Sequence, residues 1–80
     1  SEEAEQWFAR ALETEEKLKA PPLEARTRFW LGRLLLSREA PGDRDRGRRH
    51  LDRSLQIASD LGMSVLAAEI RAVGAVGRAA

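Results

Sequence analysis

The stretch that decides the fold runs from Arg46 to Met63 and reads RGRRHLDRSLQIASDLGM. Apolar or small residues recur in it at the three- and four-residue spacing of one helix face, and Gly62 follows where a left-handed residue commonly ends a helix. The residues on this face are Gly47, Leu51, Ser54, Leu55, Ala58 and Leu61. We therefore predict an amphipathic helix whose apolar face packs on neighbouring elements.

Helical periodicity continues on both sides of this stretch. We predict an all-α chain of four antiparallel helices at about 1–19, 23–38, 44–61 and 65–78. Pro21 and Pro22 separate the first two helices, because proline is tolerated in a first helical turn. Pro41-Gly42 predicts the next turn, and Asp43 or Asp45 is expected to cap the third helix.

The second helix carries apolar residues on two nearly opposite sides, so we expect it to be the most buried element, with neighbours on both sides. One side holds Leu31, Leu34 and Leu35, and the other holds Ala25, Phe29, Gly32 and Leu36. A glycine in mid-helix costs about 1 kcal/mol relative to alanine. We expect another helix to approach Gly32 closely in compensation.

Length and composition limit the class of protein. The chain has 80 residues, a formal net charge of +1 and no cysteine, which excludes disulfides and thiolate sites. It contains no apolar run of about 20 residues, the length that a membrane span needs. We expect residues 1–80 to form one helical domain of a longer cytoplasmic chain, with no membrane association.

Charge is distributed unevenly. Residues 1–19 hold six Glu against three Lys or Arg, whereas residues 20–80 hold seven acids against eleven Arg. A run of arginines is the strongest candidate for binding a partner: Arg44, Arg46, Arg48, Arg49 and Arg53. One hypothesis is a small helical nucleic-acid-binding domain that uses the Arg44–Arg53 segment. The interleaved Asp43, Asp45 and Asp52 dilute this run, so we expect a solvated face and no nucleic acid as partner.

The sequence contains no recognisable catalytic constellation. His50 is the only histidine, and a metal site would need two or three further ligands. Glu15 is the acid most clearly on an apolar face, where we expect it to pair with Arg26 or Arg33. No phosphate-binding loop or nucleophile motif occurs. We therefore expect no enzymatic activity, no metal and no cofactor.

Shifted by 43 residues, the chain matches itself weakly. Identical residues fall on one another at Arg10 and Arg53, Leu12 and Leu55, Leu18 and Leu61, Leu23 and Leu66, Ala25 and Ala68, and Arg28 and Arg71. The matches keep the apolar faces of both helix pairs in phase. Self-similarity at this period predicts a solenoid built from helix pairs.

Here the chain resembles the tetratricopeptide repeat family. The residues that carry the resemblance are Leu31-Gly32 with Leu35 in one helix, and Gly47, Leu51 and Ser54-Leu55 in the next. The resemblance implies TPR-like helix pairs, an α-solenoid fragment, and protein–protein interaction without catalysis. The phrase IASDLGM, followed by a helix rich in Ala and Arg, is similar to repeats of large multidomain bacterial regulators, which implies scaffolding in signalling or transcriptional control.

Two surfaces are further candidates for partner binding. Trp7 lies at the edge of the apolar stripe of the first helix. Val65, Ala72 and Val76 form a second stripe on the last helix, which in a longer array would meet the next helix. We expect a neighbouring repeat or protein partner to cover this stripe, or a second copy in a homodimer. The alternative is a closed four-helix bundle, in which the last helix returns to the first.

Overall fold

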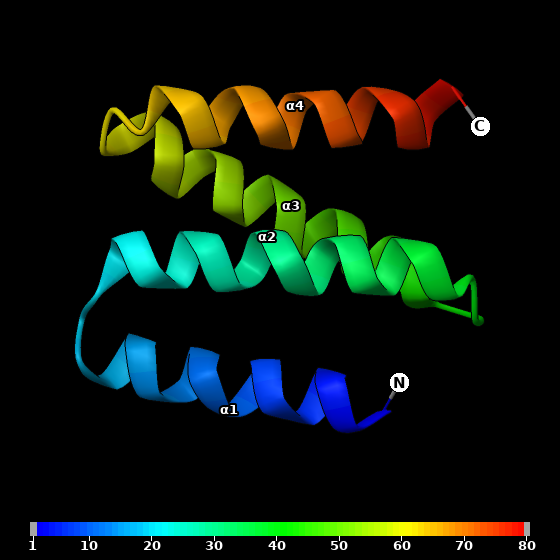
Figure 1. Cartoon of the computed structure of the whole chain (residues 1–80), viewed down its shortest axis with the longest axis horizontal. Helices are drawn as coiled ribbons and strands as arrows, with labels where there is room; N and C mark the ends of the chain where they lie inside the picture. Colours follow the sequence, from blue (N-terminus) through cyan, green and yellow to red (C-terminus); the bar gives the residue numbers. More distant parts are fainter. Residues whose placement is uncertain (1, 80) are drawn as a thin grey trace.

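A computed structural model describes the backbone of residues 2–79 and the side chains of residues 2–74. The four helices are α1 (Glu2–Lys17), α2 (Pro21–Arg38), α3 (Asp43–Asp60) and α4 (Ser64–Ala79). Their ends lie within two residues of those expected from the sequence, and no strand occurs among the described residues. The all-α class is therefore confirmed. Successive helices run in alternating directions across the molecule (Figure 1).

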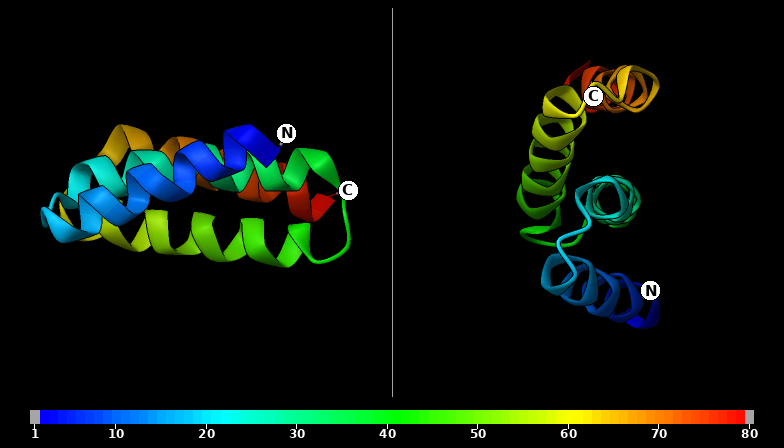
Figure 2. Two further views of the ribbon diagram at one scale, coloured as in Figure 1. Left: turned by 90° about the horizontal axis from the view of Figure 1, so that it is seen from below. Right: turned by 90° about the vertical axis from the view of Figure 1, so that its left-hand side faces the viewer.

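The helices are arranged in the order of the sequence. α2 packs on α1 and α3, α3 packs on α4, and α2 makes a smaller contact with α4. α1 and α4 lie at opposite ends of the described chain and do not contact each other (Figures 1 and 2). The molecule is flat, measuring 32 × 27 × 14 Å. The described residues thus form an open arrangement, and the closed bundle is not formed.

Apolar side chains form two clusters on the two sides of α2. Leu31 and Leu35 of α2 pack on Leu12 of α1. The second cluster joins α2, α3 and α4 through Ala25, Phe29, Leu51, Ile57, Ala58, Leu66, Ala67 and Ile70. The expected division of α2 into two apolar sides is confirmed, because each side buries its residues against a different neighbour.

The backbones of α2 and α3 come close together where the two helices cross. A Cβ atom built on Gly47 would lie 2.9 Å from the carbonyl oxygen of Gly32. A Cβ atom built on Gly32 would lie 2.8 Å from Cγ of Leu51. Both distances are shorter than van der Waals contact, so this crossing requires glycine on both helices. The close approach expected at Gly32 is confirmed.

The turn after α1 and the turn after α3 have the same geometry. Each has a left-handed residue, Lys19 (φ 52°) and Gly62 (φ 71°). Each also carries the pair of backbone hydrogen bonds that defines a Schellman motif. The bonds are Ala20 N–H to Glu15 O (3.0 Å) and Lys19 N–H to Glu16 O (3.2 Å), then Met63 N–H to Ala58 O (2.8 Å) and Gly62 N–H to Ser59 O (3.2 Å). The second set lies 43 residues after the first, so the turn repeats at the offset found in the sequence.

Candidate interaction surfaces

The five arginines of the Arg44–Arg53 segment do not gather on one face of α3. Gly47, Leu51 and Ser54 are buried and occupy the side of the helix that faces α2. Since successive residues turn by about 100°, Arg44 and Arg48 lie on one flank of this buried side. The other three arginines, Arg46, Arg49 and Arg53, lie on the opposite flank or behind it. The segment therefore divides its arginines between two sides of α3, and no single face holds all five.

Arg46 is one of four charged residues, from three helices, that pair with one another in a ring. Arg38 of α2 donates to Glu5 (2.9 Å) and to Asp43 (3.0 Å). Arg46 of α3 donates to Asp43 (2.8 Å) and also pairs with Glu5. Each carboxylate contacts both arginines, which balances charge within the ring. Arg46 thus joins α1 and α3, and of the five arginines it is the one most engaged with its own chain.

Asp43 does not cap α3 in the way expected from the sequence. The N-cap residue is Gly42, without a side-chain cap hydrogen bond, and Asp43 is the first helical residue. Its side chain is almost fully buried between Arg38 and Arg46. The hydrogen bond from Arg38, followed by the positive charges of both arginines, holds the pKa of the Asp43 carboxyl below its ordinary value. The expected cap was wrong because an ion pair across the loop engages the carboxylate.

A second charged cluster is centred on Arg28, which sequence reasoning missed. Its guanidinium donates to Glu24 (2.7 Å), to Glu16 of α1 (3.1 Å) and to Nδ1 of His50 in α3 (3.1 Å). Because arginine only donates hydrogen bonds, Nδ1 of His50 is the acceptor and carries no proton. Burial, followed by the charge of Arg28, lowers the pKa of His50. His50 is therefore a structural contact between α2 and α3.

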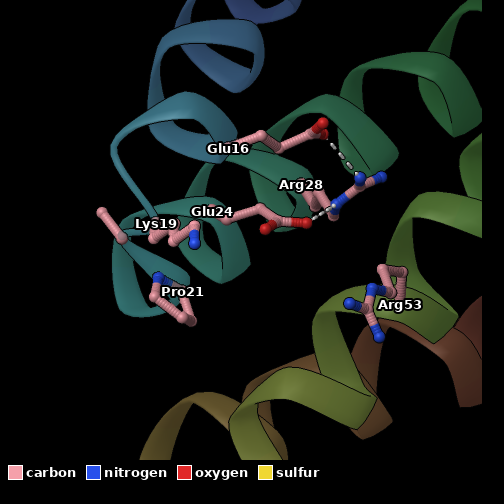
Figure 3. A pocket seen from close by; sticks show the side chains of 7 residues that line it. Glu16, Lys19, Pro21, Glu24, Arg28 and Arg53 are labelled. Carbon is pink, nitrogen blue, oxygen red and sulfur yellow. Dashed lines mark hydrogen bonds and ion pairs between the residues drawn. The ribbon is translucent and has the colours of Figure 1, made fainter.

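Figure 3 shows the hollow beside this cluster, at the turn between α1 and α2. Its volume is about 380 Å³, and its lining includes Glu16, Lys19, Pro21, Glu24, Arg28 and Arg53. The Glu24 and Glu16 carboxylates already bind Arg28, and Arg53 donates to Gln56 (3.2 Å) on its own helix. Most charged groups around this hollow therefore satisfy one another.

Glu15 pairs with a different residue from the two that the sequence suggested. Thr27 of α2 donates its hydroxyl to Glu15 Oε2 (3.0 Å). Arg33 instead lies over the rings of Phe29 and Trp30, with its guanidinium carbon 5.4 Å and 5.0 Å from their centroids. Arg26 is exposed. The expected ion pair was wrong, since helix periodicity gives the face of Glu15 but not the rotation of α2 against α1.

α4 has one buried side and one outward apolar side. Leu66, Ala67 and Ile70 are buried against α2 and α3. Val65, Ala68 and Ala72 point outward and are exposed, Val65 by 75%. The predicted stripe also included Val76, whose side chain lies outside the described residues. We call Val65, Ala68 and Ala72 the outward face of α4.

A groove of about 370 Å³ lies between α3 and α4. Its apolar lining comes from Leu51, Leu55 and Ile70, its charged lining from Arg48, Asp52 and Arg71, and Gly74 lies at its α4 side. Gly74 stands 43 residues after Leu31, which fills the corresponding space between α1 and α2. The groove exists because α4 has no side chain at this position.

Trp7 is exposed by 66%, and its ring meets the edge of Phe8 with the centroids 5.2 Å apart. It lies on α1, at the opposite end of the molecule from the outward face of α4 (Figure 1). The structure therefore does not bring the candidate residues Trp7 and Val65 into one site. It gives two apolar surfaces, one on each terminal helix.

Within the described part of the chain, no helix combines the length and the apolar composition that crossing a bilayer requires. Histidine, aspartate and glutamate side chains among those residues form no group of three or more able to hold a metal ion. Comparison of the chain with protein-family models, with curated proteins and with solved structures finds no match.

Proposed function

We propose that this chain is a non-catalytic protein–protein interaction module of the TPR-like type, serving as a scaffold within a cytoplasmic bacterial signalling or transcriptional regulator. The observation that carries the proposal is the outward face of α4. This face is apolar and exposed, whereas Ala25 and Phe29 of α2, which precede Ala68 and Ala72 by 43 residues, are buried in the cluster with α3.

The correspondence holds for Ala68 and Ala72 but not for Val65, whose equivalent, Pro22, is exposed. Ala25 of α2 is fully buried and Phe29 nearly so, in the cluster with α3. Ala68 and Ala72 follow them by 43 residues on α4 and are exposed. Apolar surface of this kind, presented by a helix that already packs on its other side, is suited to a further helix. The occupant is a neighbouring repeat, a protein partner or a second copy of the chain.

The glycine crossing supports a TPR-like repeat. The Leu31-Gly32 pair lies on α2, and Gly47 of α3 meets Gly32 through backbone contact. In the resemblance these are the positions of the small residues that let two helices of one repeat approach closely. The open order of the helices is also the arrangement that consecutive helix pairs would give.

The proposal is tested by measuring the mass of the chain in solution across a concentration series. The 8.9 kDa chain is expected to form larger species as its concentration rises. Ala72→Glu places a charge on the outward face of α4 and is expected to keep the chain monomeric. Gln56→Glu adds the same charge at an exposed site of α3 and serves as the control, because a carboxylate can still accept the hydrogen bond from Arg53.

Two outcomes would contradict the proposal. A wild-type chain that stays monomeric at all concentrations and captures no helical partner would show that the outward face of α4 does not bind proteins. Equal effects of Ala72→Glu and Gln56→Glu on mass would show that association depends on net charge alone.

A further inference from the structure

We propose that copies of this chain bind head to tail, with the outward face of α4 in one copy packed on α1 of the next. This inference rests on the proposed function and names a partner and a geometry for it. The contact would follow the pattern of the helix pair that α2 and α3 form within one chain. Ala75 and Ala4 stand at the positions of Gly32 and Gly47, so the two helices would lie farther apart than α2 and α3 do.

The first argument is that α1 is the equivalent of α3. α1 ends at Lys17 and α3 ends at Asp60, which is 43 residues later, and identical Schellman turns follow both helices. On α3, Leu51 and Ser54 are buried in the contact with α2. Their equivalents on α1 are Phe8 and Ala11, which are only half-buried. α1 therefore lacks the neighbour that α2 provides for α3.

The second argument is that α4 is the equivalent of α2. Pro21 begins α2 and Ser64 begins α4, again 43 residues later. α2 uses Ala25 to contact α3, where the Ser54 hydroxyl donates to the Ala25 carbonyl (2.6 Å). The equivalent residue, Ala68, is exposed. α4 therefore lacks the neighbour that α3 provides for α2.

These two open faces are complementary, and one copy cannot bring them together. α1 lacks an α2-like neighbour and α4 lacks an α3-like neighbour, at opposite ends of the molecule (Figures 1 and 2). A second copy supplies both missing helices. Because the two contacting surfaces differ, the interface is heterologous and repeats along a chain of copies.

The contact between Arg28 and His50 gives the register of this assembly. Arg28 of α2 lies 3.1 Å from His50 of α3. The residues equivalent to this pair are Arg71 of α4 and Trp7 of α1, both exposed. In the assembly the Arg71 guanidinium of one copy therefore lies against the Trp7 indole of the next, a favourable cation–π contact. This pairing gives the exposed tryptophan a partner.

Charge favours the same pairing. Residues 1–19 carry six Glu against three Lys or Arg, whereas residues 20–80 carry seven acids against eleven Arg. Glu5 and Glu16 are paired within their own copy, so only the net excess of acids on α1 acts between copies. This net charge attracts the basic remainder of a neighbour and repels a second α1. Because exposed charges are screened by salt, association should weaken as ionic strength rises.

A complementation experiment tests the geometry. Ala11→Glu blocks the α1 face and Ala72→Glu blocks the α4 face, so each variant alone is expected to remain monomeric in sedimentation. When the two variants are mixed in equal amounts, one intact α1 face and one intact α4 face meet. The mixture is expected to form a dimer of twice the 8.9 kDa mass and nothing larger.

Two further variants guard against misfolding. Gln56→Glu should associate as the wild type does, and circular dichroism shows whether each variant is folded. If Ala11→Glu fails to fold, Trp7→Ala replaces it, since Trp7 is exposed and its removal is expected to leave the fold intact. Trp7→Ala is expected to raise the dissociation constant about tenfold, which corresponds to the loss of about 1.4 kcal/mol.

The outcomes separate this inference from the proposed function. If Ala11→Glu and Trp7→Ala associate like the wild type while Ala72→Glu does not, α4 binds α4 of a second copy, and the head-to-tail geometry is wrong. If the mixture of blocked variants stays monomeric, the geometry is also wrong. A wild-type chain that never associates but binds another helical protein through α4 would overturn this inference and leave the proposed function standing.

Discussion

The inner face of α2, at Ala25 and Phe29, and the outward face of α4, at Ala68 and Ala72, lie 43 residues apart in the chain but have opposite surroundings. Ala25 is fully buried beneath α3, and Ala68, an identical residue at the equivalent position, is exposed. Residue type does not explain the difference between Ala25 and Ala68, because both are alanine. It arises from the neighbouring helix: α3 covers Ala25 of α2, and no helix among the described residues covers Ala68 of α4. Matched substitutions at equivalent positions can therefore measure what a neighbouring helix contributes.

The largest difference in the free energy of unfolding is expected between the variants Ala25→Leu and Ala68→Leu. Extra carbon atoms at Ala25 have no room between α2 and α3, and overpacking of this kind lowers the free energy of unfolding by about 1–3 kcal/mol. The loss for Ala25→Leu should lie at the upper end of this range, because the Ala25 side chain is fully buried beside the hydrogen bond from Ser54. Ala68→Leu should change the free energy of unfolding by less than about 0.5 kcal/mol. Urea unfolding at low protein concentration measures both values.

Equal losses from these two leucine substitutions would contradict the comparison. They would mean that the outward face of α4 is packed within a single copy as tightly as the inner face of α2. Repeating Ala68→Leu at high protein concentration extends the test, because a neighbouring copy would then make that position sensitive too.

The second difference is expected between two glycines. Gly47→Ala would place a methyl group 2.9 Å from the Gly32 carbonyl oxygen, a backbone atom that cannot move away alone. We expect a loss of about 1–2 kcal/mol, because strain exceeds the gain in helix propensity. A Cβ atom at Gly74 would meet no atom within 4 Å. Gly74→Ala should therefore raise the free energy of unfolding by up to about 1 kcal/mol. Thermal unfolding would show opposite shifts in Tm, and shifts of the same sign would refute the close crossing.

Much of the fold was predictable because it depends on local periodicity. The two apolar sides of α2 follow from helical spacing, and both are buried as that spacing requires. Gly32 was informative for a similar reason, since a glycine in mid-helix is unfavourable unless a neighbour approaches closely. The two Schellman turns are separated by the same 43 residues that align the chain with itself.

The candidate site was less predictable because charged side chains choose partners across helices. Sequence spacing placed Arg46 among five arginines of one segment, yet Glu5 of α1 and Asp43 bind it. The contact of Arg28 with Glu24 follows the i,i+4 spacing of α2, whereas its contacts with Glu16 of α1 and His50 of α3 had no signal in the sequence. The pairings between helices depend on how the helices rotate against one another, and periodicity within one helix does not contain that information.

The third difference in the free energy of unfolding is expected between substitutions at Ser54 and at its equivalent, Ala11. Ser54→Ala removes the hydrogen bond to the Ala25 carbonyl and should lower the free energy of unfolding by about 1 kcal/mol. The carbonyl keeps its helical hydrogen bond, so no buried acceptor is left unpaired. Ala11→Ser should have almost no effect, because Ala11 is half-buried without an α2-like neighbour. If urea unfolding gives the same loss for both, the hydroxyl of Ser54 contributes nothing specific.

The smallest effect is expected from the protonation of His50, which tests the α2–α3 contact alone. Burial, together with the charges of Arg28 and Arg46, lowers the pKa of His50 from 6.5, against a smaller opposing effect of Glu5. In the unfolded chain the imidazole therefore takes up its proton at a higher pH than in the folded chain. Between the two pKa values the unfolded state binds more protons, so stability falls as the pH decreases below about 6.5.

Urea unfolding at about pH 7.5 and about pH 5.5 measures this dependence above the range in which carboxylates titrate. The wild type should be less stable at the lower pH. His50→Gln should remove most of this dependence, because the amide oxygen can accept the hydrogen bond from Arg28 without titrating. A wild type that becomes more stable on acidification would show that Glu5 dominates the surroundings of the imidazole. His50 would then carry the proton in the folded state, and its contact with Arg28 could not form as described.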